Sequence, residues 1–178
     1  MTNHVHLLMT AHQKYGVSKL MQALGRKYVQ YFNFEYNRTG TLWEGRFRSC
    51  LVESENYLLE CYRYIELNPV RANMVELPTE YKWSSHTTNA HGLPSKLITP
   101  HPVYKRLGKT DLDRQVAYRL FFSRRIDQSL IEELRLSTQK GMVIGSDALK
   151  KQLAELHGGR VDNLRIGRPK KRALTPFI

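Results

Sequence analysis

Two histidines, His4 and His6, stand one residue apart near the start of the chain, in the stretch NHVHLLMT. In a β-strand, side chains two residues apart point to the same face, with their Cα atoms about 7 Å from each other. Two imidazoles on one face can hold one metal ion. The same short pattern also occurs as a polar pair on a strand surface, so the histidines alone leave both interpretations open.

A phenol and an amide form a second group, in the segment SENYLLECYRYIELNPVRANMVE. Four residues of this segment recur at helical spacing and share one stripe: Tyr57, Cys61, Tyr64 and Asn68. Tyr64 and Asn68 are therefore expected one turn apart on a common face. Aromatic stripes at helical spacing usually pack a core, which is the simpler interpretation of Tyr57 and Tyr62.

The helix that carries this stripe is predicted from Glu55 to about Leu67, with Ser54 as its N-cap. Pro69 ends it, because proline disfavours the helical conformation at the residue before it. Asn68 is therefore expected at the end of the helix. A further short helical turn is expected over residues 70–75.

The elements before this helix are predicted from the apolar pattern. Val5, Leu7 and Met9 alternate along the first segment, which predicts a strand that ends near Thr10. Ser18 is a plausible N-cap for a helix that ends near Asn37. The stretch GRFRSCLVES predicts a second strand, over about residues 46–53.

Glycine, proline and serine accumulate after residue 86, where the helical period is weak. We therefore divide the chain into residues 1–90, a linker or irregular loop over residues 91–110, and a helical C-terminal extension over residues 111–178. The extension is predicted to hold helices near residues 111–125, 127–139 and 146–157, followed by a basic tail. Ser146 is the expected N-cap of the last helix and Gly158 its stop.

Charge points to a polyanionic partner, with nucleic acid as the first candidate. The 178 residues include 28 lysines and arginines against 16 acidic residues, for a net charge of +12. No run of about 18 apolar residues is present, and residues 1–13 do not resemble a signal peptide, so a cytoplasmic protein is expected. The two cysteines, Cys50 and Cys61, support neither a disulfide framework nor a zinc cage.

Four blocks of the sequence together resemble one family. They are NHVHLL at residues 3–8, GRF at residues 45–47, YIELNPVRA at residues 64–72 and WSS at residues 83–85. In order and spacing they resemble the REP-associated tyrosine transposases, which are single-tyrosine HUH transposases of the insertion-sequence-200 type. Four ordered blocks are a far more specific signal than His-x-His alone.

The resemblance implies a metal-dependent enzyme that cleaves and rejoins single-stranded DNA near hairpins. His4, His6 and Asn68 would bind Mg²⁺ or Mn²⁺, and Tyr64 would be the nucleophile that forms a covalent 5′-phosphotyrosine intermediate. Tyr62 ranks lower as nucleophile, because it points about 200° around the helix from Tyr64. The alternative is a catalytically inactive remnant that still binds hairpin DNA. In either case the resemblance implies a cytoplasmic protein associated with the nucleoid.

Basic residues along the chain fit the same DNA substrate, although each alone can be an ordinary surface charge. The expected phosphate contacts are Lys19, Arg26, Lys27, Arg46, Arg48 and Arg71, together with Arg168, Lys170 and Lys171 in the tail.

The resemblance also implies an α+β fold, with an antiparallel sheet of the ferredoxin-like kind on which the catalytic helix packs. Family members carry a strand, a helix and part of the sheet before the histidine strand. Here Met1 lies only three residues before His4. We therefore expect either an N-terminally shortened chain or a second chain that supplies the missing strands.

Overall fold

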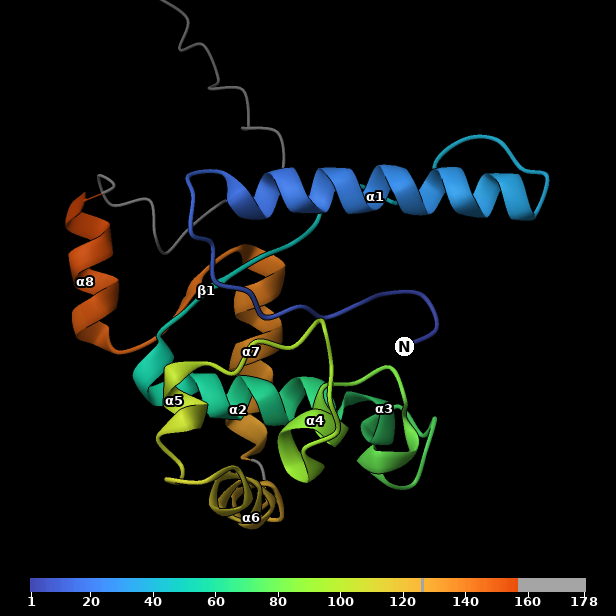
Figure 1. Cartoon of the computed structure of the whole chain (residues 1–178). Helices are drawn as coiled ribbons and strands as arrows, with labels where there is room; N and C mark the ends of the chain where they lie inside the picture. The colour runs from blue at the N-terminus through green and yellow to red at the C-terminus, as the bar shows by residue number, and fades with distance from the viewer. Residues whose placement is uncertain (126, 157–178) are drawn as a thin grey trace, which may run out of the picture.

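The computed structural model describes residues 1–125 and 127–156, apart from the side chains of Ser54 and Asn56. This part of the chain is mostly helical (Figure 1). Its elements in chain order are α1 (Gly16–Glu35), β1 (Leu51–Val52), α2 (Ser54–Glu66), α3 (Asn68–Arg71), the 3₁₀ helix η1 (Pro78–Glu80), α4 (His86–His91), α5 (Pro102–Lys105), α6 (Asp111–Phe122), α7 (Gln128–Lys140), β2 (Val143–Ile144) and α8 (Asp147–Leu156).

The sheet differs from the prediction. Within the described residues it consists of β1 and β2 alone, and the two strands are parallel, with Leu51 opposite Val143 and Val52 opposite Ile144. The predicted antiparallel sheet was therefore wrong, and the predicted strand over residues 46–53 is reduced to two residues. Residues 1–12 form no strand, because this stretch makes no backbone hydrogen bond to another described segment. Its alternation leaves Val5 65% exposed, since a strand needs a neighbour as well as a pattern.

Two hydrophobic clusters pack against different parts of α2. The first cluster is built on Cys61, Leu134 and Ile144, and so joins α2 to α7 and β2. α2 thus packs against the sheet of β1 and β2 through this cluster, but that sheet is parallel and is not the predicted antiparallel one. The second cluster is built on Ala90, Tyr104 and Tyr118, from α4, α5 and α6, with Leu59 and Tyr62 of α2 against it. The cluster lies partly within the segment expected to be irregular; the division into domains stays a prediction.

The predicted helices agree better with the structure, because their signals are local. α2, α6, α7 and α8 lie within a few residues of their predicted ranges. The cap at Ser146 is confirmed by the backbone N–H of Leu149, which donates to Ser146 Oγ at 3.3 Å. Ser18 is not a cap, since α1 begins two residues earlier, after Tyr15 in a left-handed conformation with φ of 63°. Gly158 and the basic tail lie outside the described residues.

The longest helix, α1, runs along one side of the molecule, away from α4 and α6 (Figure 1). None of its side chains is buried. The loop after α1 folds back along it, and the Trp43 indole N–H donates to the carbonyl oxygen of Gly25 at 3.4 Å. The Trp43 ring also lies 5.7 Å from that of Tyr28, so a small aromatic group covers part of the helix.

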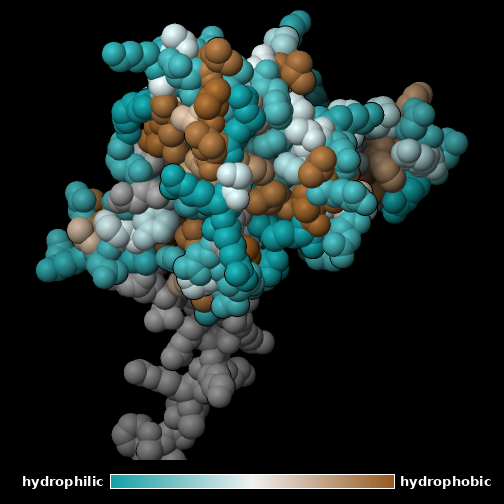
Figure 2. All heavy atoms as spheres, turned by 90° about the horizontal axis from the view of Figure 1, so that it is seen from below, coloured by the Kyte–Doolittle hydropathy of each residue, from teal (hydrophilic) through white to brown (hydrophobic). Residues whose placement is uncertain are grey.

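The surface on the α6 side carries hydrophobic patches among hydrophilic ones (Figure 2). On α6 itself, Leu112, Val116 and Leu120 are exposed and recur one turn apart. None of the helices in the described residues has the length and apolar character needed to cross a membrane.

The first cluster provides a stability test at Ile144, which is fully buried between α2 and α7. We expect Ile144→Ala to lower the free energy of unfolding by about 2–5 kcal/mol, because the cavity adds to the lost burial. Urea denaturation followed by circular dichroism measures this change. The control is Leu97→Ala, at a side chain that is 91% exposed, for which a change within about 0.5 kcal/mol is expected. Equal effects of the two substitutions would contradict the packing described for β2.

Candidate active site

The end of α2 places a phenol and an amide one turn apart. α2 ends at Glu66, and Leu67 keeps a near-helical conformation before α3 begins at Asn68. Pro69 is accommodated in the first turn of α3, where its missing N–H is not needed. Tyr64 and Asn68 therefore keep the predicted helical spacing across the junction. The Asn68 side chain is buried and that of Tyr64 is half-buried.

The N-terminal segment brings both histidines to this end of α2. The His6 ring lies 5.7 Å from the Tyr64 ring, in an edge-on arrangement at 78°. The His4 ring lies 5.0 Å from that of His6. Leu8 packs against the first cluster and so holds the segment in place. The predicted group of two imidazoles and a phenol is thus assembled, although the strand expected to carry the histidines does not form.

Arg71 joins this group from α3. Its guanidinium carbon lies 4.5 Å from the centre of the Tyr64 ring. Its Nη2 donates to the Tyr64 carbonyl oxygen at 2.8 Å and to Asn68 Oδ1 at 3.2 Å. The Arg71 Nε and Nη1 atoms are buried and have no hydrogen-bond partner among the residues that the structure describes. The charge therefore lies against the face of the phenol, where a cation is attracted by the ring.

From the sequence, Arg71 is predicted only as one of the residues that contact phosphate. Its position seven residues after Tyr64, on the same helical stripe, was the available signal that it belongs at the centre of the group.

Burial and the neighbouring charges favour the neutral form of His6. Burial lowers the pKa of His6, and the nearby positive charges of His4, Arg71 and the N-terminus lower it further. A neutral imidazole keeps a lone pair for a metal ion, whereas a protonated one has none. Burial also lowers the pKa of Arg71, and the interaction with Tyr64 opposes this shift.

The donors present fit a weak divalent-ion site. No group of three or more His, Cys, Asp or Glu side chains converges in residues 1–125 and 127–156. A site here would consist of His4 and His6 with the Asn68 amide oxygen, which accepts from Arg71 but has a second lone pair. Two imidazoles and one amide oxygen suit a transition ion such as Mn²⁺ better than Mg²⁺, which prefers oxygen ligands.

The neighbouring tyrosine and cysteine of α2 have structural surroundings. Tyr62 belongs to the second cluster, with its ring 6.4 Å from that of Tyr118. Burial and the charge of Glu66 raise the pKa of Tyr62, so its phenol stays protonated. Burial raises the pKa of Cys61 to about 12, which makes its thiol unreactive. Cys61 is thus a small buried side chain of the first cluster.

The basic residues lie in three kinds of place. Lys19, Arg26 and Lys27 are exposed on α1. Arg46 and Arg48 are exposed in the loop between α1 and β1, so they do not share the face of a strand. Arg71 lies within the candidate site, while Arg168, Lys170 and Lys171 are outside the described residues.

Comparison with known proteins finds one similar family, over the part of the chain that contains His4, His6 and Tyr64. Residues 1–68 match the model of the protein family described as "Transposase IS200 like". The match begins before the two histidines and ends at Asn68. No curated protein and no solved structure matches the chain. Over residues 1–68 the chain is therefore similar to the IS200-like transposases.

Proposed function

We propose that this protein is a metal-dependent tyrosine transposase that cleaves and rejoins single-stranded DNA. The observation that carries the proposal is the Tyr64 phenol, whose ring lies 5.7 Å from the His6 imidazole and 4.5 Å from the Arg71 guanidinium. Phosphodiester cleavage through a covalent intermediate needs a nucleophile and groups that offset the developing negative charge, and a phenol, a guanidinium and a metal ion held by imidazoles can supply them. The family match over residues 1–68 supports the same assignment.

In the proposed reaction, the Tyr64 oxygen attacks the phosphorus of a phosphodiester. The bond to the 3′ oxygen breaks, the phenol loses its proton and the leaving oxygen gains one, which gives a 5′-phosphotyrosine and a free 3′-OH. Attack by another 3′-OH reverses these steps and joins two strands. The energy of the broken bond is kept in the tyrosine ester, so no ATP is needed.

Each neighbouring residue has a distinct part in this proposal. His4, His6 and Asn68 would hold the divalent ion, which polarises a phosphate oxygen and offsets charge as the bonds change. Arg71 holds the Tyr64 main chain and the Asn68 amide through its Nη2. Its positive charge would also attract the phosphate of an approaching strand.

The DNA partner is proposed from charge and from the resemblance. A net charge of +12, with Lys19, Arg26 and Lys27 exposed along α1, favours phosphate contacts outside the reacting group. Hairpins of palindromic repeats are the proposed substrate, as in the REP-associated transposases that the chain resembles. The basic tail, with Arg168, Lys170 and Lys171, would add contacts to the same DNA.

One observation favours a second candidate function, an inactive protein that binds hairpin DNA. Among the described residues no carboxylate joins the two imidazoles, so a divalent ion there would be held by neutral donors alone. Failure to bind Mn²⁺ would leave a basic DNA-binding protein without chemistry. Adduct formation decides between the two functions.

We expect Tyr64→Phe to abolish the covalent adduct while the protein folds and binds hairpin DNA nearly as before. The substitution removes one hydroxyl and keeps the ring, yet no other atom at that position can form the phosphate ester. A suitable probe is a labelled pool of DNA stem-loops with randomised single-stranded flanks, incubated with Mn²⁺ and separated on a denaturing gel.

The matched control is Tyr62→Phe, two residues away in the same helix, which should retain the adduct. Mass spectrometry of the unmodified protein should find the nucleotide on Tyr64. A nucleotide on Tyr62 would refute the assignment, and salt-sensitive binding without any adduct would favour the inactive DNA-binding protein.

Removing either imidazole should separate chemistry from binding. We expect His4→Ala and His6→Ala to abolish Mn²⁺-dependent adduct formation and to change hairpin affinity by only a few fold, because lysine and arginine contacts supply most of that affinity. Asn68→Ala should cost less activity and should be partly rescued by more Mn²⁺, since a neutral amide is a weak ligand. Metal titrations of the adduct yield test this order. Loss of DNA binding with normal cleavage of bound DNA would exclude the metal role.

The pKa of His6 gives a test without DNA. Because its charged form is disfavoured, His6 should titrate below 6.5, and Mn²⁺ binding needs its neutral ring. Arg71→Met removes one positive charge, so the His6 pKa should rise and Mn²⁺ should be released at a higher pH. NMR titration of the His6 ring measures the shift. The control is Arg106→Met, because the guanidinium of Arg106 pairs with Glu55 at the other end of α2. An equal change of the His6 pKa in Arg106→Met would contradict the effect assigned to the charge of Arg71.

A further inference from the structure

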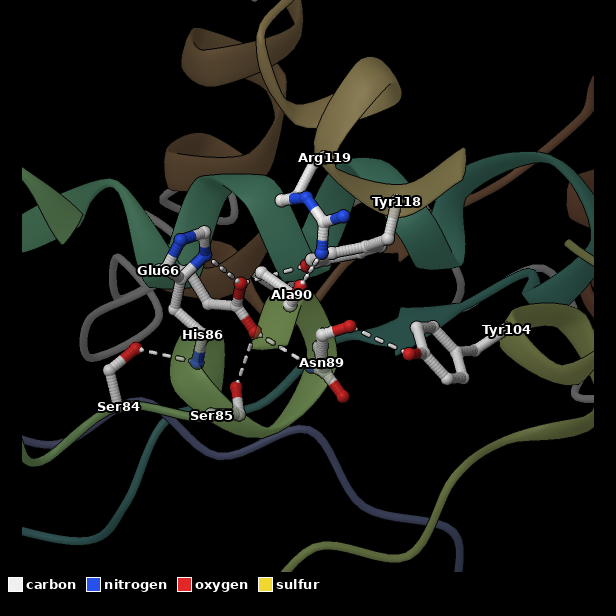
Figure 3. Close-up of polar contacts among 9 residues, drawn as sticks. All are labelled: Glu66, Ser84, Ser85, His86, Asn89, Ala90, Tyr104, Tyr118 and Arg119. Carbon is white, nitrogen blue, oxygen red and sulfur yellow. Dashed lines mark hydrogen bonds and ion pairs between the residues drawn. The ribbon is translucent and has the colours of Figure 1, made fainter. Parts of the chain in front are cut away.

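Glu66, the last residue of α2, has no exposed surface and is surrounded by hydrogen-bond donors (Figure 3). Its Oε1 accepts from Ser85 Oγ at 2.6 Å and from Asn89 Nδ2 at 2.8 Å. Its Oε2 accepts from the Tyr118 hydroxyl at 2.8 Å and is 3.1 Å from His86 Nδ1. The carboxylate thus joins the end of α2 to α4, to the residue before α4, and to α6.

A buried carboxylate is costly unless donors replace its lost water. Here each oxygen has two partners, so the carboxylate is well satisfied, and hydrogen bonds to a charged acceptor are the stronger kind. Burial and the charge of Glu66 hold the pKa of Tyr118 well above its usual range. Tyr118 therefore remains a donor at every pH at which the protein would be assayed.

The position of Glu66 on α2 relates this network to the candidate site. Tyr64 lies two residues earlier, which is about 200° around the helix. The face that carries Glu66 is held by α4 and α6, while Tyr64 and His6 meet on another side. A helix held on one face cannot rotate freely about its axis. The hydrogen bonds to Glu66 therefore restrain the rotation of the turn of α2 that carries Tyr64.

We propose that Glu66 is a positioning residue for the reaction of Tyr64, acting through the rotation of the last turn of α2. This inference rests on the proposed function. A misplacement of about 1 Å in a reacting group can cost about 100-fold in rate, so small rotations are sufficient to affect the chemistry. The sequence carried no signal for this role, since the donors come from residues far along the chain.

Two buried tyrosines of the second cluster make a matched comparison. Tyr118→Phe removes a hydroxyl that donates to Glu66, whereas Tyr104→Phe removes one that donates to the Asn89 carbonyl oxygen at 2.7 Å. Both rings are buried, and they contact each other at 5.5 Å. The two substitutions should lower the stability of the protein by similar amounts. A difference between them in the rate of adduct formation therefore measures the effect of the hydrogen bond to Glu66. Ser85→Ala removes another donor to Glu66 and serves if Tyr118→Phe does not fold.

The first readout is single-turnover adduct formation with the stem-loop pool and Mn²⁺. For Tyr118→Phe and Glu66→Gln we expect the rate at saturating DNA to fall by about 10- to 100-fold, with the half-saturating DNA concentration unchanged. For Tyr104→Phe we expect a rate within about twofold of the unmodified protein. Equal rates for Tyr118→Phe and Tyr104→Phe, both checked for folding by circular dichroism, would overturn the proposal.

The second readout needs no DNA, which separates this inference from the proposed function. Nuclear Overhauser contacts between the Tyr64 and His6 rings, 5.7 Å apart at their centres, report the direction of Tyr64. They should weaken in Tyr118→Phe and Glu66→Gln and persist in Tyr104→Phe. If the unmodified protein forms no adduct, the proposed function is wrong. The contacts between the Tyr64 and His6 rings then test by themselves whether Glu66 sets the direction of Tyr64. Contacts unchanged in every variant would overturn the positioning role.

Discussion

The burial of one carboxylate, that of Glu66, constrains the arrangement of the helices around α2. The group is stable in the interior only while Ser85, Asn89 and Tyr118 supply their hydrogen bonds. α4 and α6 must therefore pack where they do. Elsewhere α2 contacts α7 and β2 through apolar side chains around Cys61. The helix that carries Tyr64 is thus held by the hydrogen bonds to Glu66 and by apolar contacts in both clusters.

The helices could be predicted from sequence because their signals are local. The apolar period and the caps at positions such as Ser146 depend on neighbours a few residues away. The sheet could not be predicted, since the partner of β1 is β2, far along the chain and without a distinctive pattern. The alternation of Val5 and Leu7 was a sound observation, yet these side chains are exposed because no described strand lies beside them.

The residues of the candidate site also divide into those with a local signal in the sequence and those without one. His4, His6, Tyr64 and Asn68 could be selected because each stands in a short block with fixed spacing, and spacing along a helix is enough to bring a phenol and an amide together. Arg71 could be selected in the same way, because it lies seven residues after Tyr64 on the same helical stripe. Glu66 could not be recognised, because its surroundings come from α4 and α6, and sequence spacing does not report contacts between separate helices.

The pairing of distant segments has a consequence for the order in which the protein can fold during synthesis. Ser146 contacts Glu53 across 93 residues, and Tyr118 contacts Glu66 across 52. Closing such long loops costs entropy that local helix formation does not, and chains rich in such contacts fold slowly. α1 and α2 leave the ribosome first, but α2 cannot bury Glu66 or pack beside β2 until α6 and β2 have followed. The apolar side of α2 therefore stays exposed until β2 has been synthesised, an interval in which a chaperone would find a binding site.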